Sequence, residues 1–95
     1  MPRYVVLINW TEQGVRNFKD TVDRYEAVKQ IGEVSFVDLY WTVGQYDLVG
    51  VTEAPDDETM AAAMLRVASA GNLRTTTMRA FDADQMRGVI ARATA

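Results

Sequence analysis

Four β-rich runs are interrupted by two helical segments in this chain. The β-rich runs hold many β-branched and aromatic residues and are bounded by turn formers, and they cover residues 3–10, 33–43, 46–52 and 73–81. The helical segments show apolar residues at spacings of three and four. The first is predicted to begin at Val15 or Asn17 and to end at Ile31, and the second to run from residue 54 to Gly71. The order β-α-β-β-α-β leaves few topologies open, because connections are short and parallel crossovers are right-handed.

This order is the split β-α-β pattern of the ferredoxin-like α+β fold. We expect one domain, residues 1–95, with an antiparallel four-stranded sheet in the order 4-1-3-2 and both long helices on one face. Asp82 and Gln85 predict a capping box at the start of a short C-terminal helix.

A turn at Gly44-Gln45 predicts how the second and third β-rich runs pair. Glycine at the first central position suits a two-residue type II′ turn. Such a turn would place Trp41 opposite Leu48 and Leu39 opposite Gly50.

The β-rich runs carry large apolar residues at both alternating phases. In residues 33–43, simple alternation puts Leu39 and Trp41 on one face and Phe36 and Tyr40 on the other. A sheet built from such strands needs cover on both faces, because an exposed apolar patch of that size marks an interface. Since the two long helices would cover one face, we expect a second copy of the same sheet to cover the other in a homodimer or higher oligomer.

The composition removes several functional classes. The chain has no cysteine and no histidine, which excludes disulfides, His-ligated metals and Ser-His-Asp triads, and we expect no metal site and no cofactor. A net charge of -3 with scattered arginines predicts no nucleic acid partner. The longest aliphatic run, residues 5–8, is far shorter than the ~20 residues that span a membrane, so we expect a cytoplasmic protein.

Tyr46 and Asp47 are the first candidates for a binding site. A phenol and a carboxylate at a pocket mouth can donate, accept or transfer protons. The alternative is that Tyr46 packs across the strands while Asp47 caps the turn. Arg16, near the start of the first helix, is an anion-binding candidate whose alternative role is a solvated surface charge.

Several segments resemble the GYD domain family. They are the G-x-Y-D sequence at residues 44–47, the N-W-T-x-Q-G-x-R pattern at residues 9–16, the helix entry at residues 53–57 and the Gly71-Asn72-Leu73-Arg74-Thr75 segment. Together they extend over nearly the whole chain. The resemblance implies a dimeric α+β barrel of ferredoxin-like protomers, and it implies no particular reaction.

A second group of candidates comes from the similarity in architecture to cofactor-independent monooxygenases of the wider dimeric α+β barrel superfamily. Asn9 and Arg79 could stabilise an enolate, and Trp10 and Trp41 could form an apolar wall beside it. Against this, aromatic residues in strands commonly belong to a core or an interface, and fold analogy alone does not establish a reaction.

Two functional classes therefore stay open. The first is a homo-oligomeric domain that binds a small organic molecule, or only assembles, with any ligand in the cleft between sheet and helices. The alternative is a cofactor-independent oxygenase or isomerase acting on an aromatic or polyketide-like substrate. The lack of histidine and cysteine favours the first class.

Overall fold

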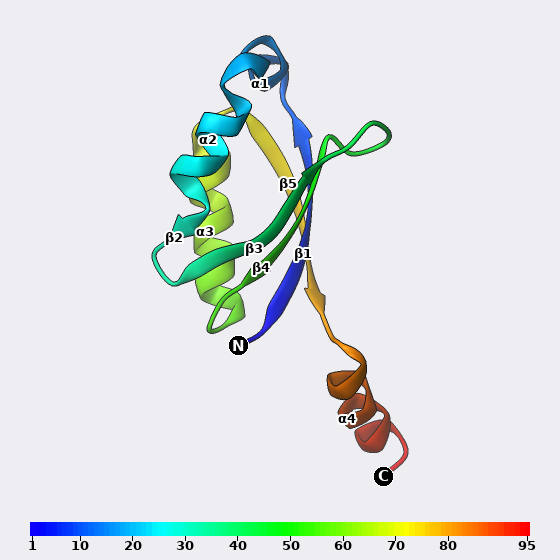
Figure 1. Ribbon diagram of the computed structural model, residues 1–95. Helices are drawn as coiled ribbons and strands as arrows, with labels where there is room; N and C mark the ends of the chain where they lie inside the picture. Colours follow the sequence, from blue (N-terminus) through cyan, green and yellow to red (C-terminus); the bar gives the residue numbers. More distant parts are fainter.

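A computed structural model describes all 95 residues, and Figure 1 shows a twisted antiparallel sheet with helices beside it. The strands are β1 (Arg3–Trp10), β2 (Gln30–Ile31), β3 (Val34–Trp41), β4 (Leu48–Glu53) and β5 (Leu73–Ala80). The helices are α1 (Glu12–Arg16), the 3-10 turn η1 (Phe18–Asp20), α2 (Thr21–Val28), α3 (Asp57–Ser69) and α4 (Ala83–Ala93). The sheet order is β2-β3-β4-β1-β5. The predicted order of the four long strands is confirmed, but the sheet has five strands rather than four.

The fifth strand, β2, lies where the sequence predicted the end of the first helix. That helix ends at Val28, and Gln30 and Ile31 pair instead with Ser35 and Val34. Gly32 makes the turn between the two strands with a φ of +56°, a conformation that glycine adopts without steric cost. The prediction of a helix extending to Ile31 was therefore wrong, because Gly32 serves a hairpin and not a helix end.

The first helical segment is also divided into three short pieces. Thr11 caps α1, and its Oγ1 accepts a hydrogen bond from the Gly14 N–H at 3.1 Å. The helix breaks at Asn17, and η1 leads into α2. The Arg24 guanidinium, through Nη1, donates to the Asn17 carbonyl at 2.8 Å and so satisfies an acceptor at the break.

The pairing of β3 with β4 follows the predicted register. Trp41 lies opposite Leu48, and Leu39 lies opposite Gly50. However, β3 ends earlier and β4 begins later than expected. Residues 42–47 form the connection, which is closed by a 2.8 Å hydrogen bond from the Thr42 N–H to the Asp47 carbonyl. The two-residue type II′ turn is wrong, while the register it implied is right.

A β-bulge at Val37 changes which residues of β3 face the helices. The register shifts between Phe36 and Asp38, so Phe36 and Leu39 lie on the same face although three positions separate them. A Cβ built at Gly50 would meet both of these side chains, at 3.0 and 3.1 Å. The predicted separation of Phe36 from Leu39 was wrong, because simple alternation does not hold across the bulge.

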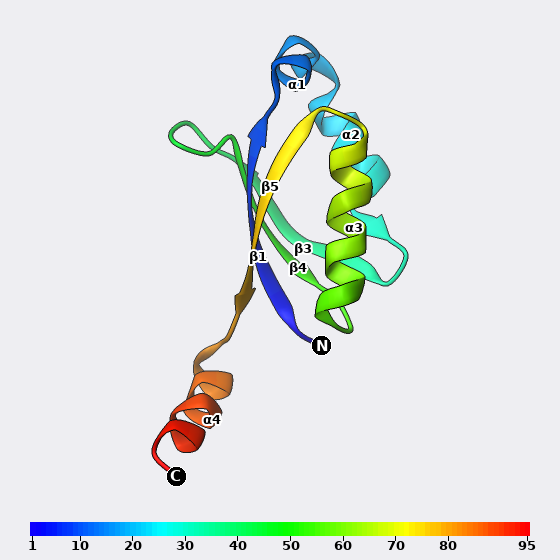
Figure 2. The same cartoon turned by 180° about the vertical axis from the view of Figure 1, so that it is seen from behind.

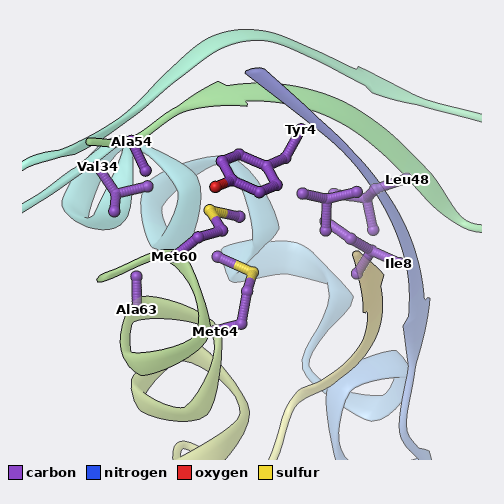
Figure 3. Packing of buried hydrophobic residues seen from close by; sticks show 9 residues of the cluster. Tyr4, Ile8, Val34, Leu48, Ala54, Met60, Ala63 and Met64 are labelled. Carbon is purple, nitrogen blue, oxygen red and sulfur yellow. The ribbon is translucent and has the colours of Figure 1, made fainter. Parts of the chain in front are cut away.

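Both α2 and α3 lie on one face of the sheet, as Figures 1 and 2 show from opposite sides. Figure 3 shows the core between α3 and the sheet, where Met60 and Met64 point toward Tyr4. Only 12 of the 95 residues are buried. This core is small for a chain of this length, and much apolar surface is left uncovered.

The other face of the sheet has no cover within the chain, and we call it the outer face. Residues opposite one another across neighbouring strands share a face, and the outer face carries six large apolar side chains: Val5, Leu7, Tyr40, Val49, Val51 and Met78. Tyr40 is 64% exposed and Met78 is 42% exposed.

The capping box at Asp82 and Gln85 that begins α4 is confirmed. This helix projects away from the sheet (Figures 1 and 2), and all of its residues are exposed. Met86 and Ile90 are therefore left without cover. No helix of the structure has both the length and the apolar character needed to cross a bilayer.

Candidate functional site: a cavity between the helices and the sheet

A cavity of about 230 Å³ lies between α2, α3 and the helix-covered face of the sheet. Most of its lining is apolar and includes Tyr25, Val28, Phe36, Leu39, Leu48 and Val67. Tyr4 and Met60 do not line the cavity and lie in the buried core beside it. The arrangement can accept an apolar group of limited size.

Aromatic side chains form one wall of this cavity. The Tyr25 ring meets Phe36 and Trp41 edge to face, each with ring centroids 5.9 Å apart. The Trp41 indole N–H donates to the Thr21 hydroxyl at 3.0 Å. These contacts hold α2 against β3; Tyr25 and Phe36 line the cavity, and Trp41 lies behind them outside it.

The charged side chains that line the cavity are both positive. Arg24 and Arg66 both contribute to the lining, and no aspartate or glutamate does. The Arg24 Nη2 atom is buried and has no hydrogen-bond partner. Buried donors are nearly always satisfied in folded proteins, so this nitrogen marks a position where a bound group can accept.

Sequence reasoning missed Arg24 and Arg66. A signal was present for Arg24, which follows Thr21 by three residues and precedes Val28 by four. Those spacings put Arg24 on the helix face that carries the apolar stripe. The seven residues that the sequence singled out lie elsewhere, and none of them lines the cavity.

Asp47 connects the start of β4 to β1. Its carboxylate accepts from the Trp10 backbone N–H at 2.9 Å, and its own N–H donates to the Ile8 carbonyl at 2.9 Å. The Tyr46 carbonyl accepts from the Thr42 hydroxyl at 2.6 Å, while the Tyr46 hydroxyl makes no hydrogen bond. The structure thus gives the Asp47 side chain a role in holding two strands together.

Asn9 and Arg79 lie apart from each other. Asn9 is on the outer face, opposite Arg74, whereas Arg79 is on the helix-covered face, opposite Tyr4. The five residue steps from Tyr4 to Asn9 correspond to roughly 17 Å along β1. The Arg79 guanidinium lies 4.6 Å from the Phe81 ring centroid and 5.7 Å from that of Tyr4.

The two tryptophans and Arg16 complete the set of predicted residues. Trp41 is 38% exposed and packs on α2, and the Trp10 indole nitrogen is buried without a partner. Arg16 is exposed and pairs with Glu12 in the same helix. The structure does not bring the Asn, Trp and Arg candidates into one group.

Two of the recognised segments do meet. The Thr11 N–H donates to the Asn72 carbonyl at 3.0 Å, and its hydroxyl donates to the Gly71 carbonyl at 2.5 Å. The Gln13 side-chain amide donates to the Asn72 side chain at 3.0 Å. A Cβ at Gly14 would lie 2.0 Å from the Asn72 carbonyl oxygen, so only glycine allows this approach. Residues 9–16 and 71–75 therefore form one structural unit.

The Tyr4 hydroxyl has a raised pKa. Burial, and then a 2.5 Å hydrogen bond to the Asp57 carboxylate, raise the pKa of Tyr4 from its usual 10 to about 12. The hydroxyl ties β1 to the first turn of α3. Asp56 caps that helix by accepting from the Thr59 N–H at 2.7 Å. Hydrogen bonding with the Thr59 side chain, and then with its N–H, lowers the pKa of the Asp56 carboxyl. No cluster of three or more acidic side chains suited to a metal ion forms.

These features define a small α+β domain with helices and a cavity on one face of an antiparallel sheet and an open apolar face on the other. The chain belongs to the GYD domain family, whose family model matches residues 4–90. It is similar to a protein of Thermus thermophilus named "Glutamine synthetase and cystathionine beta-lyase binding protein". The two are 38% identical over 85 residues, which cover 85% of this chain and 90% of the relative. No solved structure matches the chain.

Proposed function

We propose that this chain is a homo-oligomeric binding domain whose copies assemble back to back through the outer face and whose assembly binds a protein partner. The open outer face is the observation that carries the proposal. Val49 lies between Leu7 on β1 and Tyr40 on β3, so the apolar side chains are contiguous across three strands. Large contiguous apolar patches on a soluble chain mark interaction sites.

A second copy of the chain is the occupant that fits this face best. Two-fold packing lets one apolar patch cover an identical patch, which is the usual arrangement in homodimers. The small core gives the chain a reason to assemble, since only 12 residues are buried without a partner. The resulting pair of sheets would form the dimeric α+β barrel that the resemblance to the GYD domain family implies.

The printed name of the Thermus relative supports the protein-binding part of the proposal. That relative is named for binding two enzymes, glutamine synthetase and cystathionine beta-lyase, and it aligns with most of this chain. Phe81 and the exposed apolar residues of α4 offer a contact surface for a protein partner outside the sheet.

The enzymatic alternative draws little support from the geometry. A cofactor-independent oxygenase or isomerase needs donors gathered around a developing negative charge. The proposed donors Asn9 and Arg79 lie on opposite faces of the sheet, and neither lines the cavity. We therefore favour binding over catalysis.

Light scattering at micromolar concentration tests the assembly. The natural chain should form a species of at least two copies, and Val49→Lys should reduce it to the monomer because a charge would be buried in the interface. Val22→Lys is the matched control, since Val22 is a 52% exposed valine on α2 and is not part of the outer face. A monodisperse natural chain of 10.6 kDa would refute the assembly.

Sedimentation with purified glutamine synthetase and, separately, cystathionine beta-lyase tests the choice of partner. Co-sedimentation of the natural chain with either enzyme would support the proposal. If the chain sediments alone in both mixtures, the relative's partners do not extend to this protein.

A further inference from the structure

We infer that the cavity between α2, α3 and the sheet is a binding site for a small organic carboxylate, with its apolar body between the helices and its charge at Arg24. This inference goes beyond the proposed assembly, which uses the opposite face of the sheet. It depends on the charge, the hydrogen bonding and the size of the cavity.

The charge of the lining selects an anion. The chain contains 13 acidic and 10 basic residues, yet the only ionisable charges along the cavity are Arg24 and Arg66. Neither arginine takes part in any ion pair of the structure, although four other basic side chains do. An apolar cavity lined by unpaired cations in an acidic chain is complementary to a negatively charged ligand.

Hydrogen bonding identifies the atom that would receive the ligand. The Asn17 carbonyl holds Arg24 Nη1 at 2.8 Å, which fixes the orientation of the guanidinium. Nη2 of the same group is buried and has no partner. Carboxylate and phosphate oxygens are the acceptors that arginine binds most strongly and with the most suitable geometry.

The size and chemistry of the remaining wall limit the rest of the ligand. An apolar protein cavity of about 150 Å³ holds benzene, so about 230 Å³ accommodates a substituted or fused ring. Val28, Leu39 and Val67 supply aliphatic walls, and Phe36 supplies an aromatic one. A singly charged acid suits this wall better than a phosphate dianion, because burying a second charge without a partner is costly.

Isothermal titration calorimetry with 2-naphthoate and its neutral isostere 2-naphthamide tests the inference on the natural chain. The two probes have the same shape and differ in charge. We expect 2-naphthoate to bind at least about tenfold more tightly, which is the range for a hydrogen bond to a charged group. Equal affinities, or no binding of 2-naphthoate at millimolar concentration, would overturn the inference.

Arg24→Gln should abolish the preference for the acid, whereas Arg16→Gln, which changes an exposed arginine outside the cavity, should leave it intact. A retained preference in Arg24→Gln would also overturn the inference. Amide chemical shifts of the natural chain locate the probe independently of any variant. Shifts centred on Leu48 and Val67 support the cavity, and shifts centred on the outer face refute it.

Discussion

Substitution of Gly14 by alanine should destabilise the protein, although Gly14 lies within a helix, where alanine is normally favoured. The Cβ of the alanine would lie 2.0 Å from the Asn72 carbonyl oxygen and 2.9 Å from its carbonyl carbon. Both are backbone atoms, which cannot rotate away as the end of a side chain can. The start of β5 would have to move by about 1 Å to restore the 3.0 Å separation that Cβ atoms require.

This movement sets the magnitude of the effect. Overpacking of this kind costs about 1–3 kcal/mol. The displacement would also weaken the two hydrogen bonds from Thr11 to Gly71 and Asn72, each worth about 0.5–1.5 kcal/mol. The better helix propensity of alanine returns about 1 kcal/mol. We expect a net loss of about 3 kcal/mol in the free energy of unfolding.

Urea denaturation followed by tryptophan fluorescence measures this loss. Gly88→Ala is the matched control, because a Cβ there meets no atom within 4 Å. The control should leave the denaturation midpoint unchanged or raise it, because alanine also has the better helix propensity within α4, while Gly14→Ala should lower it at an unchanged slope. If Gly14→Ala costs less than about 0.5 kcal/mol, the close contact between residues 9–16 and 71–75 is not as described.

Three further expectations follow from single side chains. The stability contribution of Tyr4 should be fully present below pH 10 and lost as the pH rises toward its folded pKa of about 12, because Tyr4 of the unfolded chain ionises first. Between these pH values the denaturation midpoint should fall less in Tyr4→Phe than in the natural chain. Equal falls would contradict the raised pKa of Tyr4. Asp47→Ala should cost about 1–2 kcal/mol in chemical denaturation because the Trp10 N–H loses its acceptor, whereas Tyr46→Phe should change neither stability nor the binding of 2-naphthoate. Trp41→Ala should cost about 1–2 kcal/mol in the same assay, below the ~3–5 kcal/mol of a fully buried aromatic residue, because Trp41 is 38% exposed; a larger loss would mean that assembly buries it.

Much of the fold could be predicted because it depends on local patterns. Alternation and turn formers located the four long strands, and the predicted turn at Gly44-Gln45, although its type was wrong, implied the right register of Trp41 against Leu48. The capping residues of α4 were equally visible, since Asp82 and Gln85 bond to backbone groups three positions away. Such features need no knowledge of distant contacts.

The features that escaped prediction depend on tertiary contacts. The bulge at Val37 could not be seen, because residues 33–43 are apolar at both phases and fit either face. The helix break at Asn17 is supported by Arg24, seven residues away, and the short β2 exists only where β3 offers an edge. The cleft between sheet and helices was expected as the place of any ligand, but the residues that line the cavity escaped prediction, since they come from two helices and all five strands.

The sheet separates the two proposed surfaces by a single layer of backbone, and this allows them to evolve separately. Ile8 lines the cavity while its neighbour Leu7 belongs to the outer face, and the same holds for Leu48 and Val49. Replacement of an outer-face residue can thus alter which chain binds there, while the adjacent residue, which lines the cavity, is unchanged and ligand binding is kept. Through substitutions at alternate positions of the same strand, related chains can change their assembly partner and keep their ligand. They can equally change their ligand and keep their assembly partner.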